Sequence, residues 1–108
     1  MSKFDDYVSG IRDGAKDLAK KLFKDFDKEA VDDTRDFLDR TDAKLRKWTR
    51  QLADEDLTRA EFEDLVKGQA DLAKLGALTQ AGVAATKLER FRSGLVDLAV
   101  NTAVDIFL

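Results

Sequence analysis

The sequence predicts an all-α protein, a long antiparallel helical hairpin that assembles as a dimer into a four-helix bundle. Three observations predict this fold class. Apolar residues recur at steps of three and four along nearly all of the 108 residues. The chain contains no proline, so nothing removes a helical amide or blocks a turn. The clearest punctuation, residues 54–58, divides one predicted domain, 1–108, into two arms of similar length.

The first arm, about residues 4–53, carries an apolar stripe with heptad-like spacing. The stripe begins with Phe4, Val8, Ile11, Ala15, Leu18 and Leu22. Opposite charges four residues apart, such as Asp17 with Lys21 and Asp42 with Arg46, each add a few tenths of a kcal/mol to a helix. The pattern continues past Trp48, which lies in phase with the stripe. We therefore expect helix over nearly all of 4–53.

The turn at 54–58 is followed by two helix-start signatures at the same place. Thr58 and Glu61 fit a capping box, in which the Thr oxygen accepts from a free amide and the Glu side chain reaches back to the cap. Leu57 and Phe62 fit the accompanying hydrophobic staple. Together these four residues predict that a second helix begins at Arg59.

The second arm, about residues 59–107, is also predicted to be helical, with a break allowed near Gly76–Gly82. Each glycine costs about 1 kcal/mol relative to alanine in a helix interior. If the arms form a hairpin, residue i lies near residue 111 − i. This register places three aromatic residues opposite the small residues of 76–85, and it predicts that Gly82→Leu overpacks that contact. The three aromatic residues are Phe23, Phe26 and Phe37.

The last fourteen residues, 95–108, present more apolar surface than one partner helix can cover. Ten of them are apolar, and the polar residues Asp97, Asn101 and Asp105 form one narrow stripe. A patch of this width is more than monomeric proteins usually expose. A homodimer, or a higher even oligomer, is therefore expected. Its predicted interface is Val96, Leu98, Val100, Ile106 and Phe107.

Composition restricts the chemistry. Cysteine and histidine are both absent, which excludes thiolate catalysis and removes the commonest metal ligand and general base. The 19 basic and 22 acidic residues are interspersed, a pattern unlike a basic surface built for nucleic acid. We expect no catalytic, cofactor or metal site and no nucleic-acid partner. We also expect no signal peptide or membrane span, and a cytoplasmic location.

Residues 16–28 support an alternative, binding to a lipid or hydrophobic surface. Leu18, Leu22, Phe23 and Phe26 share one helix face, with lysines beside them. In composition this segment resembles the surface helices of exchangeable apolipoproteins and of polymer-granule coat proteins. That resemblance implies reversible binding to a hydrophobic surface through these four side chains.

The sequence therefore predicts a non-enzymatic helical protein that self-associates as an interaction or scaffold protein. Reversible binding to lipid or hydrophobic surfaces is the alternative, and an enzyme of unassigned type is the third reading. Residues 52–65 are also similar to the turn of short bacterial helical-hairpin modules. This similarity rests on the cap and the staple, so it implies no activity.

Overall fold

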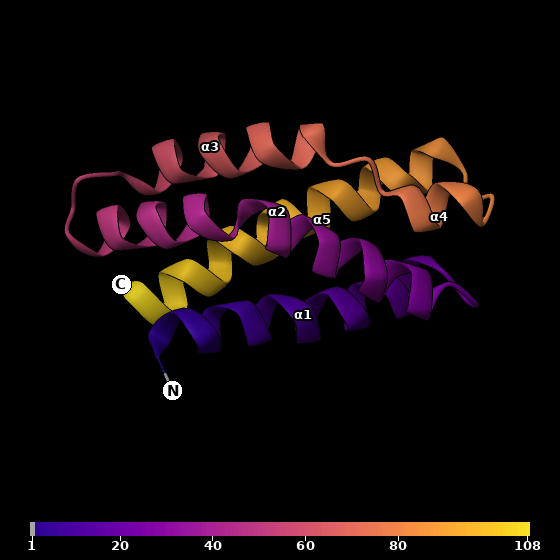
Figure 1. Cartoon of the computed structure of the whole chain (residues 1–108), viewed down its shortest axis with the longest axis horizontal. Helices are drawn as coiled ribbons and strands as arrows, with labels where there is room; N and C mark the ends of the chain where they lie inside the picture. The colour runs from indigo at the N-terminus through magenta and orange to yellow at the C-terminus, as the bar shows by residue number, and fades with distance from the viewer. Residues whose placement is uncertain (1) are drawn as a thin grey trace.

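The computed structural model describes residues 2–108, and over these residues the chain is helical with no strand (Figure 1). Four long helices and one short helix follow one another along the chain. They are α1 (Lys3–Leu22), α2 (Asp27–Ala53), α3 (Arg59–Leu72), α4 (Gly76–Gln80) and α5 (Ala85–Phe107). The predicted all-α class is confirmed.

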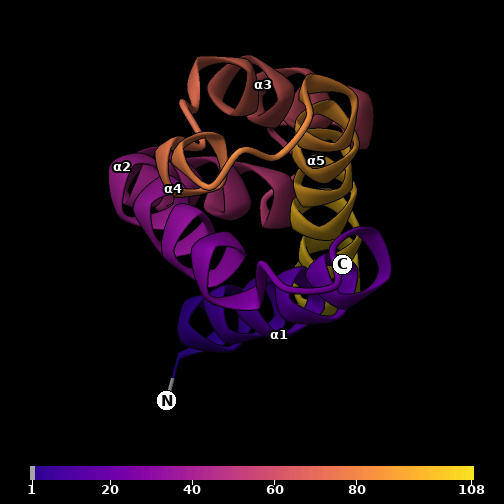
Figure 2. The same cartoon turned by 90° about the vertical axis from the view of Figure 1, so that its right-hand side faces the viewer.

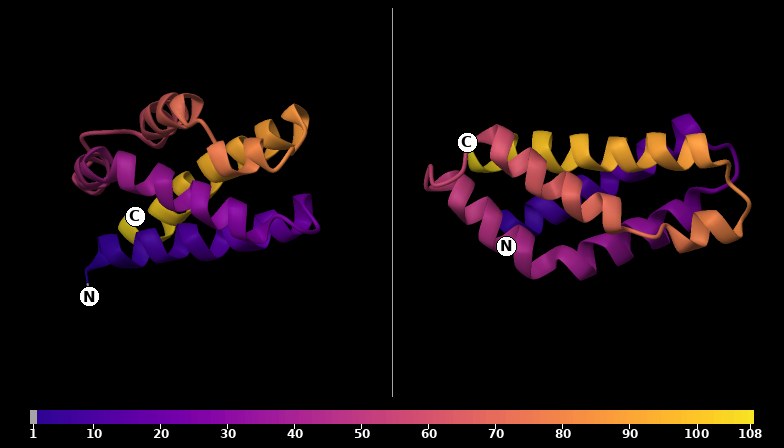
Figure 3. Two further views of the ribbon diagram at one scale, coloured as in Figure 1. Left: turned by 45° about the vertical axis from the view of Figure 1, so that its right-hand side comes forward. Right: turned by 90° about the horizontal axis from the view of Figure 1, so that it is seen from above.

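The four long helices run alternately up and down and pack side by side within the single chain (Figure 1; Figure 3). Helix α1 contacts α2 and α5, and α3 contacts α2 and α5. The folded chain measures 42 × 26 × 21 Å. One end carries the turn 54–58 and is called the turn end. The other carries the connectors 23–26 and 81–84 and is called the hinge end; Figure 2 views the molecule from there.

The expectation of nearly continuous helix over 4–53 is wrong at residues 23–26. Phe23 adopts an extended backbone, φ −129° and ψ 139°, and ends α1. Its side chain is 2% exposed and lies in a cluster with Leu75, Leu78 and Phe91. Burying this ring among residues of the second arm requires the chain to leave the helix. The second arm is also broken, on both sides of α4.

The predicted pairing of the two arms nevertheless agrees with the structure to within one residue. A Cβ atom built on Gly10 would meet Thr102, one on Gly14 would meet Leu98, and one on Gly94 would meet Leu18. The two residue numbers in each pair add to 112. Beyond the break, Asp33 of α2 bonds to Ala77 and Leu78 of α4. The molecule is therefore the predicted hairpin folded back on itself.

The turn and its cap are as predicted. Helix α2 ends at Ala53 and α3 begins at Arg59. The Thr58 hydroxyl accepts from the Glu61 amide at 3.1 Å, and Glu61 Oε1 accepts from the Thr58 amide at 2.9 Å. Phe62 is fully buried and Leu57 is half-buried. The local sequence therefore specifies this helix start.

Thr58→Ala is expected to lower the free energy of unfolding by about 1 kcal/mol, because the Glu61 amide loses its partner. The bonds from the Thr58 backbone and side chain hold the pKa of Glu61 below its ordinary value. Losing the side-chain bond should raise that pKa part of the way back. An NMR titration of the Glu61 carboxyl and urea unfolding of both proteins measure the two effects.

The pH dependence follows from the direction of this shift. A carboxyl whose pKa is lower in the folded state stabilises the protein above its unfolded pKa, and the contribution is lost as pH falls through the folded pKa. Thr58→Ala should therefore weaken the acid dependence of unfolding between these two values. An unchanged Glu61 pKa together with unchanged stability would contradict the role given to this cap.

The apolar side chains form two clusters along the length of the molecule. The first lies toward the turn end and contains Tyr7, Phe37, Leu45 and Phe62; the second lies toward the hinge end and contains Phe23, Leu78 and Phe91. The Tyr7 hydroxyl donates to the Ala99 carbonyl oxygen at 3.0 Å and ties α1 to α5. Burial raises the pKa of the Tyr7 phenol above its ordinary value.

The predicted overpacking at Gly82 is not supported. No atom lies within 4 Å of a Cβ built on Gly82, whose φ is +89°. Replacing Gly82 would strain a left-handed backbone instead of crowding a contact. Phe23 packs against the second arm as predicted and Phe26 packs half-buried beside it, whereas Phe37 belongs to the first cluster.

Candidate functional site

The residues predicted to form an oligomer interface are largely covered within the chain. Val96 and Val100 are 8% and 1% exposed, and Leu98, Ile106 and Phe107 are half-buried. All five pack into or against the two clusters, because α1, α2 and α3 surround α5. The wide apolar surface of α5 thus has partners in its own chain. Association of copies stays a prediction, and exposed apolar surface on α5 no longer argues for it.

The expectation that four lipid-facing residues share one helix face is wrong, because α1 ends at Leu22 and the connector 23–26 at the hinge end holds Phe23 and Phe26. Phe23 is buried, while Leu18, Leu22 and Phe26 are half-buried against the second cluster. Leu18 lies in the crossing of α1 and α5 beside Gly94. The other three line a hollow at the end of the molecule.

This hollow, called the hinge-end hollow, has a volume of about 620 Å³. Its walls come from the last turn of α1, the two connectors and the first turn of α5. It is lined by Lys20, Lys21, Leu22, Phe23, Lys24, Asp25, Phe26, Gly82, Val83, Ala84 and Lys87. Two segments about sixty residues apart in sequence therefore build one surface.

Aromatic and aliphatic groups form the floor of the hinge-end hollow. The Phe23 and Phe26 rings are 6.2 Å apart in an edge-to-face arrangement, and Phe23 also lies 5.7 Å from the Phe91 ring. Val83 and Leu22 are half-buried beside them. Phe23 is itself buried in the core and supports the Phe26 ring, so the accessible apolar surface of the hollow comes from Phe26, Val83 and Leu22.

Lysines form the rim. Lys20, Lys21, Lys24 and Lys87 are exposed, and Asp25 is the one carboxylate among the lining residues. Within residues 2–108 the ion pairs join arginines to carboxylates, and none involves these four lysines. Lys20 and Lys21 also sit in the last turn of α1, where cations offset the helix dipole. Helix stability accounts for these two positions but not for Lys24 or Lys87.

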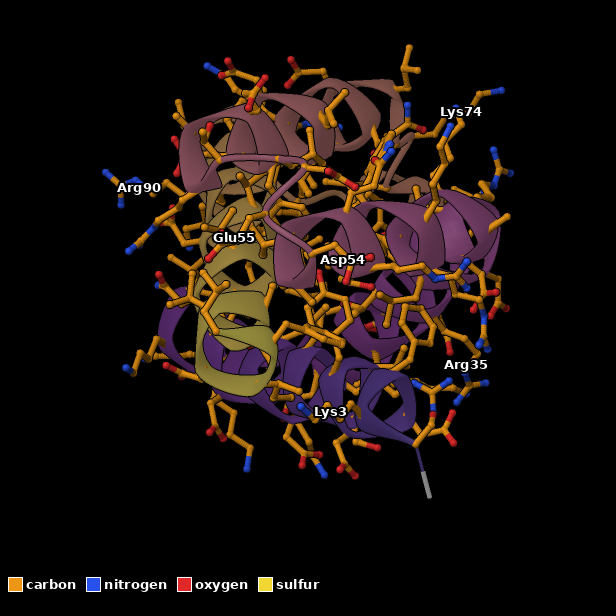
Figure 4. The ribbon with its side chains drawn as sticks, turned by 90° about the vertical axis from the view of Figure 1, so that its left-hand side faces the viewer. Lys3, Arg35, Asp54, Glu55, Lys74 and Arg90 are labelled. Carbon is orange, nitrogen blue, oxygen red and sulfur yellow. The ribbon has the colours of Figure 1, made fainter. Side chains whose placement is uncertain are left out.

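The turn at the opposite end is acidic. Asp54, Glu55 and Asp56 occupy the turn between α2 and α3, and Figure 4 shows Asp54 and Glu55 at that end. A chain of net charge −3 thus combines an acidic turn with a hinge-end hollow whose lining is basic, although the first turn of α2 beside the hollow carries Asp27 and Glu29. At physiological ionic strength the Debye length is about 8 Å, so over the 42 Å length of the molecule the two ends act separately.

Two polar residues not singled out from the sequence fix the elements around this end. Asp33, 7% exposed, accepts from the amides of Ala77 and Leu78 at 2.9 Å each and so caps α4 from α2. Arg92 of α5 donates to the carbonyl oxygens of Ala70 and Ala73 at the end of α3. Both join segments distant in sequence, so no local motif marks them.

The hinge-end hollow was predicted only in part. The sequence pattern indicates the lysines and aromatic residues of 16–28 as a surface-binding segment, but it does not indicate Gly82, Val83, Ala84 and Lys87. If 23–26 is placed in a loop and residue i is paired with a residue near 111 − i, these four residues fall opposite the end of the segment 16–28. Trp48, the single tryptophan of the chain, follows the predicted helix stripe and is half-buried against the first cluster.

Among residues 2–108, no group of acidic side chains has a geometry that could hold a metal ion. No helix in the described part of the chain is both long and apolar enough to cross a bilayer. Known protein families, curated proteins and solved structures were all compared with this chain, and none of them matches it.

Proposed function

We propose that this protein is a non-enzymatic helical module that binds anionic lipid surfaces reversibly through its hinge end. The observation that carries the proposal is the hinge-end hollow, in which four exposed lysines lie around the half-buried side chains of Leu22, Phe26 and Val83. This is the pairing of groups that an interface of anionic headgroups and acyl chains would engage.

The charge arrangement favours one orientation. Each lysine near an anionic membrane contributes about 1 kcal/mol, and the contribution falls off within a Debye length. The lining of the hinge-end hollow carries four lysines and one aspartate, which gives a net attraction at the hollow itself, while Asp27 and Glu29 lie beside it in the first turn of α2. The acidic turn at 54–58, at the far end, would be repelled. The protein should therefore bind end-on, with the helices pointing away from the surface.

The apolar floor makes a second contribution to the free energy of membrane binding. Phe26, Val83 and Leu22 are half-buried, so they retain surface that a bilayer could cover at about 25 cal/mol per Å². One weak apolar contact combined with a basic rim is typical of reversible attachment.

A charge-reversal experiment tests this proposal. The triple variant with Lys21, Lys24 and Lys87 changed to Glu is expected to lose about 100-fold or more in partitioning to vesicles containing phosphatidylserine. Flotation of the vesicles measures the bound fraction. Binding of the parent protein should weaken as salt is raised and should be absent from neutral phosphatidylcholine vesicles.

A matched control separates the hinge end from overall charge. Lys3, Lys44 and Lys47 are exposed and lie toward the turn end (Figure 4 shows Lys3). Changing these three to Glu alters the net charge equally and should reduce binding far less. Equal losses in both triple variants would show that the hinge end is not the site. Absence of parent protein from floated anionic vesicles would refute the proposed function altogether.

Self-association is the function expected first from the sequence, and it is a second candidate here. It is favoured because the molecule is a long hairpin folded over at one end, and two such hairpins could pair with each other. The pairing of its arms holds on both sides of the bend at 23–26. This feature is independent of the lysine rim.

A further inference from the structure

The folded chain consists of two halves, each an antiparallel arrangement of helices. Half one is α1 with α5, tied by the bond from Tyr7 to Ala99. Half two is α2 with α3 and α4, tied by Asp33 and by the turn 54–58. Only two segments connect the halves, residues 23–26 and 81–84, and both lie at the hinge end (Figure 2).

The contacts between the halves are extensive and involve residues far from the connectors. Arg92 of half one bonds to the carbonyls that end α3, and the Arg46 guanidinium of half two lies 4.3 Å from the centre of the Phe4 ring of half one. The first cluster also draws on both halves, with Tyr7 and Ile11 from one and Phe37 and Leu45 from the other. None of these contacts requires that the two halves belong to the same chain.

The first connector has little that fixes its bend locally. It reads Phe-Lys-Asp-Phe, without proline or glycine. Helix α2 begins after Phe26 with no side-chain cap, in contrast to Ser2 of α1 and Thr58 of α3. Charges at the ends of α1 and α2 favour the break only by tenths of a kcal/mol each. The burial of Phe23 therefore largely decides the bend.

The second connector stops α4 with glycine. The Gly82 amide donates to the Thr79 carbonyl and the Val83 amide donates to the Leu78 carbonyl, which is a Schellman arrangement. Gly82 has the positive φ that this requires. Glycine also adopts other conformations readily, so this connector can redirect the chain.

We infer that two copies of this chain exchange halves to form a two-fold symmetric dimer. In the dimer both connectors straighten, and half one of each copy packs on half two of the other. Every contact between halves is then made twice, between chains instead of within one. The partner is a second copy of the chain, and no new surface is needed. The dimer is the extended-hairpin bundle that the sequence pattern predicts.

Substitutions in the first connector test the exchange. Lys24→Ala with Asp25→Ala raises helix propensity where the monomer is bent and the dimer is helical. The expected result is an increase of about tenfold in the dimerisation constant, because each dimer contains two connectors. Lys28→Ala with Asp32→Ala makes the same changes at exposed sites that are helical in both forms, and should leave the constant unchanged. Sedimentation equilibrium measures all three proteins.

Complementation distinguishes exchange from side-by-side association. Ile11→Asp in half one and Leu45→Asp in half two each place a carboxylate at a buried site, 0% and 1% exposed. Each variant refolded alone should lack the native fluorescence of Trp48. Refolded together, they should recover it in a heterodimer that has one undamaged set of helices.

The results decide the inference in either direction. No enrichment of dimer in the Lys24 and Asp25 variant, relative to its control, overturns it. Enrichment without recovery in the mixed refolding also overturns it, because the dimer would then form without exchange. Neither measurement involves lipid, so the inference can fail while the proposed function stands, and the reverse also holds.

Discussion

Gly94→Leu is expected to lower the free energy of unfolding by about 1–3 kcal/mol through overpacking. A Cβ atom built on Gly94 meets the side chain of Leu18, and one on Gly14 meets that of Leu98. Helices α1 and α5 therefore approach closely by fitting each leucine over the glycine of the other helix. A leucine at residue 94 would push the helices apart and also disturb the second cluster, against which Leu18 and Leu98 pack.

Gly68→Leu is the matched control. Gly68 is exposed in α3, and no atom lies within 4 Å of a Cβ built there. The same substitution should raise stability by about 0.5–1 kcal/mol, because leucine has the higher helix propensity. Urea unfolding with a constant m-value measures both changes. Equal and small effects at residues 68 and 94 would contradict the close approach of α1 and α5.

Asp33→Ala is expected to cost about 2–3 kcal/mol and to release α4 from α2. The carboxylate accepts from the amides of Ala77 and Leu78, and hydrogen bonds to charged groups are among the stronger ones in proteins. Leu78 is fully buried, so its amide would lose its partner without gaining water. Leu75, just before α4, has the unfavourable φ of 47°.

Hydrogen exchange locates the effect. The amides of residues 77 and 78 should lose protection in Asp33→Ala, while those of α3 keep it. Asp32→Ala is the control, because Asp32 is the exposed neighbour of Asp33 and a surface substitution of this kind changes stability by less than about 0.5 kcal/mol. If the two alanine variants unfold at the same urea concentration, Asp33 does not hold α4 in place.

The sequence alone determines the helical class, the turn at 54–58 and the pairing of the arms. Each depends on neighbours along the chain or on a periodic pattern. Thr58 and Glu61 form their reciprocal bonds across three residues, so a motif read locally is sufficient. The pairing follows from the position of the turn, which sets the register of everything beyond it.

Only the part of the candidate site that comes from the first arm could be predicted from the sequence. The basic and aromatic residues of 16–28 stand out in composition, but Lys87 and Val83 join them through the fold. Asp33 and Arg92 look like ordinary surface charges in the sequence. Their roles depend on backbone groups of other elements, which carry no side-chain signature.

Only the tertiary structure decided that the hairpin folds back at residues 23–26 and that its own helices cover α5. An apolar stripe specifies that a surface must be covered, and the free energy of covering it depends on area rather than on which chain supplies the cover. Within one chain the covering helices are already tethered, so no translational freedom is lost. In this structure the chain covers its own apolar surface by bending at Phe23, and the bend also buries the Phe23 ring.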